Sequence, residues 1–230
     1  GMGSTITNFL SKFFYVESYR MDGTAARVEF TEGVLTKPLT PIKTNKNSKK
    51  HGLITTFAPS DMVGDLTVEW QDLEYLTWLI AHLCKIGTRV TFNAIDKVGQ
   101  KHKSIIENKN GLYDLLTGIC KNNLMQPIHF MYDNGTMKIE VLFTYDVTAM
   151  DDPEILGFAN MCPSNSGTHV DGFTDGLIKF FRDYMNKIYL ANNKKLTVNA
   201  QDIRTGLRAV VSCFHIKGLF TGRYIAPSFQ

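Results

Sequence analysis

The sequence predicts a mixed α+β protein built in two parts, and three observations lead to this fold class. Short strand patterns separated by turn signals dominate the first quarter of the chain. Amphipathic helical patterns follow from residue 69, and a strand hairpin with long helices follows residue 108. The 230 residues suffice for one large or two small domains, and 43% hydrophobic with 20% charged residues is typical of a globular chain.

Composition excludes several classes of protein. The net charge of +3 permits a polyanionic partner without requiring one. No apolar run approaches the ~20 residues of a membrane helix, and no basic segment precedes an apolar one as in a secretory signal. The cysteines are isolated from each other and from histidine clusters, so we expect reduced thiols in a cytoplasmic protein and no zinc site. They are Cys84, Cys120, Cys162 and Cys213.

The first part of the chain is expected to hold a helix, three strands and a basic loop. Residues 4–12 fit a short amphipathic helix. The expected strands are "FFYVESYR", "AARVEFTEG" and "LITTFAPS", and Asp22-Gly23 suits a tight turn between the first two. Residues 35–52 carry two prolines and several lysines, which do not easily join a central strand, so we expect an exposed basic loop there.

A strong helical pattern covers residues 69–86. Its apolar positions at helical spacing are Leu73, Leu76, Leu79, Ile80 and Leu83. "TRVTFNAI" alternates as a strand does, a polar turn at Gly99 leads into "KSIIEN", and "GLYDLLTGIC" fits a short helix.

The second part opens with a hairpin whose turn is Asn134-Gly135. One face of its second strand is expected to carry Ile139, Val141, Phe143 and Tyr145. Residues 151–166 look like a loop. Residues 167–190 form a long helix, for which we expect a buried stripe of Phe173, Leu177, Phe180, Phe181, Tyr184 and Ile188.

The last elements are a short helix in "NAQDIRTGL" and a buried strand in "LRAVVSCFHI". Asn199 is the expected N-cap of the helix, and Asp202 at the third position completes a near capping box.

The opening "GMGSTITNFLS" has two interpretations. A Gly-x-Gly before a helix lets the backbone approach a phosphate closely, and the helix start presents free N–H groups to it. Ser4 and Thr5 add hydroxyl donors. A cloning remnant joined to a start methionine explains the same residues.

Four stretches resemble motifs of one family, in the family's order and over nearly the whole chain. "GMGSTITNFLSKFFYVESYR" resembles a glycine-rich ATP lid with its helix and next strand, and "KKHGLITTFAPS" resembles a Gly-Thr-x-(apolar)-x-Phe-x-Pro strand. "SNSGTHVDGF" is similar to Gly-Gly-Thr-His-x-x-Gly-Phe, and "NAQDIRTGLRAVVS" to Asp-(apolar)-Arg-x-Gly-Leu-x-Ala. The family is the ATPase subunits of type IIA DNA topoisomerases, which include DNA gyrase B, the topoisomerase IV B protein and the phage topoisomerase large subunits.

The resemblance implies a fold and a function. Residues 1–108 would be the C-terminal part of a GHKL ATPase sandwich, and residues 109–230 a transducer domain similar to ribosomal protein S5 domain 2. The parent would be an ATP-hydrolysing type II topoisomerase, an isomerase that uses ATP and Mg²⁺. Its partners would be duplex DNA, a cleavage (A) subunit and a second copy of itself, with no membrane. The implied lid remnant, which would contact nucleotide, is Gly1, Gly3, Ser4 and Thr5.

Other family residues have no counterpart here. The family's general base, magnesium ligand and adenine-binding Asp all precede the lid, so no catalytic residue is assigned, and we expect this chain alone to be inactive and to bind no cofactor. Leu53 follows Gly52 where the family has Thr. In "LFTGRYIAPSFQ", either Arg223 and Ile225 replace the family's Gln and switch Lys, or an insertion leaves the chain ending just before that loop.

Two groups of basic residues are candidates for contacts with DNA phosphates. Lys46, Lys49 and Lys50 lie in the expected basic loop. Lys179 and Arg182 lie on the long helix, where the family has a basic residue facing the transported duplex. An ordinary solvated surface explains both groups equally simply, because each phosphate contact gives only a modest, salt-sensitive gain.

His169 is expected to form a structural hydrogen bond in its Gly-Thr-His turn, since the sequence suggests no catalytic triad around it. Two alternative functions stay open. One is a stand-alone nucleic-acid-binding module without ATPase activity. The other is a different GHKL relative, such as a mismatch-repair or chaperone ATPase, against which the Gly-Thr-His-x-x-Gly-Phe segment argues.

Overall fold

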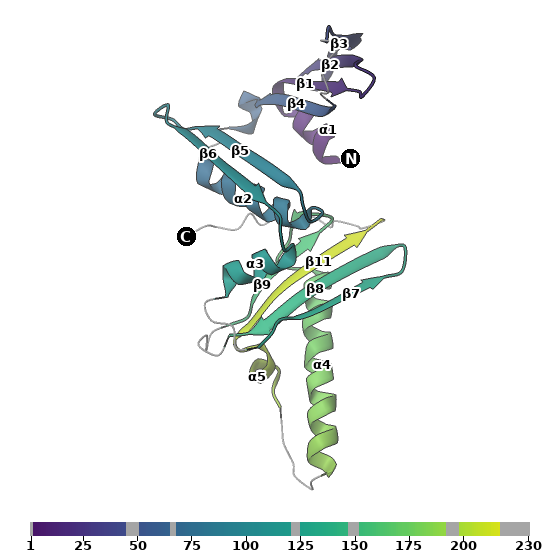
Figure 1. Cartoon of the computed structure of the whole chain (residues 1–230), viewed down its shortest axis with the longest axis vertical. Helices are drawn as coiled ribbons and strands as arrows, with labels where there is room; N and C mark the ends of the chain where they lie inside the picture. Colours follow the sequence, from purple (N-terminus) through teal and green to yellow (C-terminus); the bar gives the residue numbers. More distant parts are fainter. Residues whose placement is uncertain are drawn as a thin grey trace. The chain divides into compact units, whose positions relative to one another are not determined.

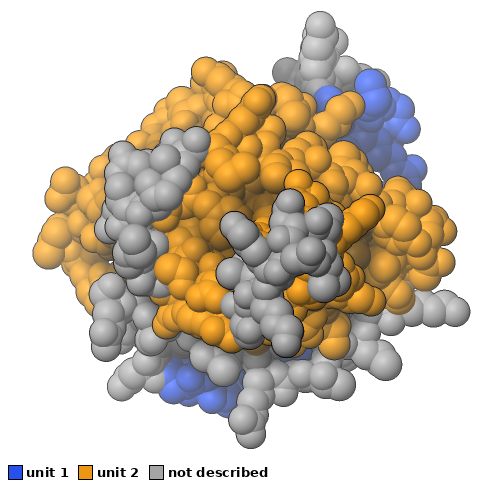
Figure 2. All heavy atoms as spheres, turned by 90° about the horizontal axis from the view of Figure 1, so that it is seen from below, with its two compact units in different colours: residues 1–68 blue, residues 69–230 orange. Residues whose placement is uncertain are grey.

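The computed structural model describes residues 2–44, 51–64, 68–120, 125–146, 152–191 and 198–216. The chain divides into two compact units, Gly1–Val68 and Glu69–Gln230, which Figure 2 shows in separate colours. The units are therefore described one after the other.

The first unit is a four-stranded antiparallel sheet with a short helix (Figure 1). Its elements are α1 (Met2–Phe9), β1 (Ser11–Tyr19), β2 (Ala25–Thr31), β3 (Val34–Pro41), β4 (Gly52–Pro59) and the 3-10 turn η1 (Asp61–Val63). The strand order is β3-β2-β1-β4, so β3 and β4 form the two edges. The predicted turn between β1 and β2 is present, and the Asp22 carboxylate accepts a hydrogen bond from the Thr24 N–H at 2.8 Å.

Part of the predicted basic loop is a strand. Residues 35–41 belong to β3, which pairs with β2 through two register shifts. Pro38 and Pro41 fit there because an edge strand has only one neighbour to hydrogen-bond. The loop prediction is therefore wrong for these residues. Residues 45–50 lie outside the described part of the chain.

A row of four apolar side chains, here called the unit 1 row, crosses one face of the first sheet. Phe14 of β1 lies opposite both Phe30 of β2 and Phe57 of β4. Phe30 in turn lies opposite Leu35 of β3. Phe14 is 7% exposed, whereas Phe57 and Leu35 at the ends of the row are 50% and 53% exposed. The unit's own residues therefore bury the centre of the row but not its ends.

The second unit is built around a five-stranded sheet with helices on both faces (Figure 1). Its elements are α2 (Trp70–Leu83), β5 (Arg89–Ile95), β6 (Lys101–Glu107), α3 (Leu112–Ile119), β7 (Ile128–Asp133), β8 (Met137–Tyr145), β9 (Glu154–Ala159), β10 (Cys162–Pro163), α4 (Thr168–Ala191), α5 (Ala200–Arg204) and β11 (Leu207–His215). The strand order is β10-β9-β11-β8-β7, with β9 and β11 parallel and the other pairs antiparallel. Strands β5 and β6 form a separate hairpin.

The β7–β8 hairpin confirms its sequence prediction. The side-chain oxygen of Asn134 accepts hydrogen bonds from the N–H groups of Thr136 and Met137, at 3.0 and 2.8 Å. The predicted inner face of β8 is also confirmed. The cluster on that face contains Val141, Phe143, Leu207, Ala209 and Val211, with Ile139, Tyr145, Ile155 and, from α4, Phe173 and Leu177 packed against it.

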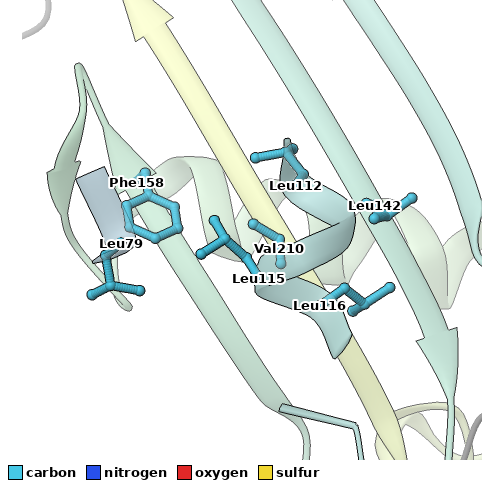
Figure 3. Close-up of a cluster of buried hydrophobic side chains, with 7 residues drawn as sticks. All are labelled: Leu79, Leu112, Leu115, Leu116, Leu142, Phe158 and Val210. Carbon is cyan, nitrogen blue, oxygen red and sulfur yellow. The ribbon is translucent and has the colours of Figure 1, made fainter. Parts of the chain in front are cut away.

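The opposite face of the sheet packs against α2 and α3. This cluster, drawn in Figure 3, consists of Leu79, Leu112, Leu115, Leu116, Leu142, Phe158 and Val210. Leu115 and Leu116 of α3 and Val210 of β11 are fully buried. Alternate residues of β8 and β11 therefore fill two separate hydrophobic cores, one on each face of the sheet.

The predicted apolar stripe of α2 is only partly correct. Leu79 is buried and Leu83 packs against the cluster of Figure 3. Leu73, Leu76 and Ile80 are instead 45%, 39% and 37% exposed.

The stripe of α4 is correct only where the helix crosses the sheet. Phe173 and Leu177 pack on the sheet. Phe180, Tyr184 and Ile188 are 61%, 52% and 39% exposed, because the helix continues beyond the sheet (Figure 1).

The prediction of a loop over residues 151–166 is wrong, because β9 and β10 lie within this range. Strand β9 occupies an interior position of the sheet, between β10 and β11. Its sequence, "EILGFA", contains a glycine and shows no clear alternation, so the pattern carries little strand signal. The strand is held by the backbone ladders of two neighbours.

The short helix before β11 begins as predicted. The Asn199 N–H donates to the Asp202 carboxylate at 2.8 Å, and the Asn199 side chain accepts from the backbone at the third position, so the capping box is complete.

The predicted domain boundary between residues 108 and 109 stays a prediction. The division into compact units falls between Val68 and Glu69, so α2, β5 and β6 belong to the same compact unit as α3. Helix α2 contributes Leu79 to the core that α3 also builds.

Candidate nucleotide and DNA contact sites

The first candidate site is the start of α1. Gly3, Ser4 and Thr5 lie in the first turn of this helix rather than in a loop before it, and Gly1 lies outside the described residues. The Thr7 hydroxyl donates to the Gly3 carbonyl at 2.9 Å. A Cβ added at Gly3 would meet no atom within 4 Å, so the backbone there is openly accessible.

The chemistry of this turn suits an anion. The first N–H groups of a helix have no partner within the helix, and the helix dipole places partial positive charge at its start. The first turn of α1 contains no acidic side chain that would repel a phosphate. A phosphate contact at Gly3, Ser4 and Thr5 stays a prediction.

The second candidate site is the exposed side of α4. Lys179 and Arg182 are both solvent-exposed and lie three residues apart, so they project from the same side of the helix. The Arg182 Nε donates to the Val198 carbonyl at 3.2 Å, which ties α4 to the segment before α5. In the part of the chain that the structure describes, Lys179 makes no ion pair.

The three lysines of the predicted basic loop, Lys46, Lys49 and Lys50, lie outside the described residues. They belong to the first unit, whereas α4 belongs to the second. The structure therefore does not bring the two groups of candidate DNA contacts together.

The turn before α4 has a structural role, as predicted for His169. The Nε2 atom of His169 donates to the Ser164 carbonyl at 3.1 Å, which fixes the segment between β10 and α4. Burial lowers the pKa of this imidazole, and the Ser164 bond and nearby Asp171 oppose that shift in part. Gly167 adopts a φ of +125°, which side-chain-bearing residues rarely adopt, and the ring of His169 lies over it.

Sequence reasoning missed a surface cavity of about 330 Å³ beside this turn. Its lining residues are Asp152, Pro153, Ile155, Asp171, Thr174, Asp175, Gln201 and Arg204. Gln201 donates to the Asp152 carboxylate at 3.3 Å. These residues come from the segment entering β9, from α4 and from α5, so no sequence motif could join them.

Two further features bear on function. Within the described ranges, no group of three or more His, Cys, Asp or Glu side chains is placed to hold a metal ion. None of the described helices is both long enough and apolar enough to cross a bilayer.

Comparison with known proteins gives a consistent result. A family model described as DNA gyrase B matches residues 95–223, more than half of the chain. The DNA gyrase B protein of Campylobacter jejuni is 30% identical over 214 residues, which cover 92% of this chain and 27% of that protein. The DNA topoisomerase 4 B protein of Mycoplasma capricolum is 29% identical over 220 residues, covering 92% and 32%.

A solved structure extends the likeness to the fold. The 43K ATPase domain of Thermus thermophilus gyrase B, determined with an aminocoumarin, is 25% identical with a TM-score of 0.69. The match covers 94% of this chain and 58% of that domain. The α+β fold class predicted from the motifs is thereby confirmed.

The chain spans about a third of the length of the curated relatives it matches. The family model, these relatives and the solved ATPase domain agree with the family predicted from the four motifs. The chain belongs to the DNA gyrase B family.

Proposed function

We propose that this chain supplies the rear part of an ATPase domain and a transducer domain to an ATP-dependent type II DNA topoisomerase, where it couples ATP binding and hydrolysis to DNA strand passage. The observation that carries the proposal is the match of 94% of the chain, spanning both compact units, to a single gyrase B ATPase domain. A protein similar to only one of the units would not support such coupling.

The second unit has the features of a mechanical coupling element. Its sheet is fixed by hydrophobic cores on both faces. The 24-residue α4 leaves this rigid base and extends about 36 Å at the usual rise per residue. A small rotation of the sheet would therefore move the far end of α4, with its basic side chains, by a larger distance.

The proposed cofactors are ATP and Mg²⁺. The described residues fit part of this requirement, since the first turn of α1 offers N–H groups near Gly3, Ser4 and Thr5 to a phosphate. The described residues include no carboxylate cluster for a metal ion. We therefore assign no step of ATP hydrolysis to them.

The proposed partners are duplex DNA, a cleavage (A) subunit and a second copy of the same protein, in the cytoplasm. Lys179 and Arg182 are the proposed DNA contacts of the second unit. Lys46, Lys49 and Lys50 are proposed contacts of the first.

A chimaera tests the function. The 214-residue stretch of Campylobacter jejuni gyrase B that matches this chain would be replaced by the corresponding residues of this chain, and the hybrid combined with the cleavage subunit of that gyrase. We expect ATP-dependent supercoiling above that of a hybrid lacking the stretch. A hybrid that hydrolyses ATP but passes no DNA would contradict the transducer role and favour a stand-alone nucleic-acid-binding module.

A further inference from the structure

The two edges of the first sheet differ in how they are protected from pairing with another strand. Exposed edges usually carry charges, prolines or bulges that prevent association. Strand β3 carries Lys37, Pro38 and Pro41 and pairs through two register shifts. Strand β4, "GLITTFAP", has no charged residue, and its one proline is its last residue. Six of its eight residues are exposed.

The hydrogen-bonding direction of β4 follows from its end. The Ser60 N–H donates to the Leu10 carbonyl on the β1 side at 2.8 Å. Successive residues of a strand direct their N–H groups to opposite sides. The N–H groups of Ile54 and Thr56 therefore face β1, and those of Leu53, Thr55 and Phe57 face outward. No other strand in the described ranges pairs with this outer edge.

The side chains of the same outward residues lie on an incompletely covered face. Leu53 and Phe57 are 73% and 50% exposed, and Phe57 belongs to the unit 1 row. Leu35 at the far end of that row is 53% exposed. An apolar sheet face of this kind is normally covered by a second layer.

We propose that the outer edge of β4 accepts a β-strand, and the apolar face beside it a covering layer, from the part of a gyrase B ATPase domain that this chain does not match. This rests on the proposed function of the first unit. The solved Thermus thermophilus domain supplies the occupant, since this chain accounts for only 58% of it. A second copy of this chain, paired β4 to β4, would satisfy the edge but leave the exposed face of each sheet uncovered.

The test uses the full chain and, as probe, the unmatched part of the Thermus thermophilus ATPase domain, produced as a separate soluble polypeptide. Binding is measured by calorimetry, and amide protection by hydrogen exchange. We expect a complex in which the Leu53, Thr55 and Phe57 amides become protected. The Ile54 and Thr56 amides are expected to be protected already in the free chain.

A pair of variants isolates the edge. Thr55→Pro removes one outward N–H and leaves the β1 ladder intact, so we expect probe binding at least tenfold weaker. Thr55→Val keeps that N–H and should bind as the original chain does. Circular dichroism confirms that both variants are folded.

Three outcomes would overturn the proposal. They are the absence of binding, binding without new protection of the three outward amides, and equal binding by Thr55→Pro and Thr55→Val. Protection of those amides by self-association of the chain without the probe would identify a second copy as the occupant instead. The supercoiling chimaera does not depend on these results, so failure of the edge proposal and failure of the proposed function are distinguishable.

Discussion

The hydroxyl of Tyr145 connects two elements that are distant in sequence. It donates to the Ile203 carbonyl at 2.8 Å, joining β8 to α5. Its ring meets the ring of Phe181 edge-on, at a centroid distance of 6.4 Å. Burial raises the pKa of this phenol to about 12. The structure therefore requires the neutral, donating form of Tyr145.

Replacing Tyr145 by Phe keeps the ring and removes the donor. We expect a loss of about 1 kcal/mol in the free energy of unfolding, because one buried hydrogen bond is lost and a carbonyl is left unpaired. Urea titration at neutral pH measures it. Since the unfolded phenol ionises near 10.0 and the folded one near 12, the stabilisation present below pH 10 is lost as the pH rises toward 12. An unchanged alkaline slope in Tyr145→Phe would contradict this account.

A single buried amide closes the C-terminal end of α2. Asn108 is 1% exposed, and its Nδ2 donates to the carbonyls of Ala81 and Cys84 at 3.2 and 2.8 Å. Its Oδ1 accepts from the Gly111 N–H at 2.8 Å, just before α3. Asn108 therefore satisfies helix-end carbonyls that otherwise lack partners.

We expect Asn108→Ala to lower the free energy of unfolding by about 2–3 kcal/mol, because buried carbonyls and an N–H lose their partners together. Asn108→Asp should be at least as harmful, since a carboxylate has no donor for the α2 carbonyls. Thermal unfolding followed by circular dichroism compares the two. A change below about 0.5 kcal/mol, the usual range for surface substitutions, would show that water replaces the amide.

At the scale of elements, β9 depends on the absence of one side chain. A Cβ at Gly157 would lie 2.1 Å from the Ser164 carbonyl oxygen and 2.8 Å from Val170. That carbonyl also accepts the His169 bond, and the Ser164 N–H donates to the Gly157 carbonyl at 2.7 Å. The turn before α4 therefore packs directly on the backbone of β9.

We expect Gly157→Ala to destabilise the chain by about 1–3 kcal/mol, the range for overpacked sites. Gly172→Ala is the matched control. Gly172 lies in α4 with no atom within 4 Å of an added Cβ, so alanine there should stabilise by up to about 1 kcal/mol. Urea midpoints of both variants test the contrast, and equal shifts would refute it.

Local signals explain which elements the sequence could predict. The Asn134-Gly135 turn, the alternation of β8 and the Asn199–Asp202 capping box are set by neighbouring residues, and each is present in the structure. Strand β9 and the burial of α4 depend on partners distant in sequence. The apolar pattern of α4 continues to Ile188, but the sheet that covers it does not extend that far.

The candidate sites follow the same rule. Motifs placed Gly3, Ser4 and Thr5 at the start of a helix, since this depends on adjacent residues. The cavity lined by Asp152 and Arg204 could not be predicted, because folding alone brings its three segments together.

At the scale of the whole molecule, we expect this chain by itself to show no ATP turnover. The first turn of α1 offers phosphate donors, but the described residues include no carboxylate cluster to hold Mg²⁺. A coupled-enzyme ATPase assay measures turnover. Gly3→Pro, which changes the backbone of the first turn, is the informative variant. Measurable hydrolysis that Gly3→Pro abolishes would contradict the expectation.

The proposed DNA contact on α4 predicts a measurable salt dependence. A lysine that contacts one phosphate releases about one counterion, so Lys179→Ala should weaken binding to a short duplex and reduce the slope of log K against log salt by about 1. Fluorescence anisotropy of a labelled duplex, at several salt concentrations, measures both effects. Lys97→Ala is the control, because Lys97 is also exposed but belongs to the β5–β6 hairpin and is paired with Glu69 at 2.7 Å. If both variants show the slope of the original chain, α4 contacts no phosphate through Lys179. If both reduce it equally, binding follows the overall charge rather than this helix.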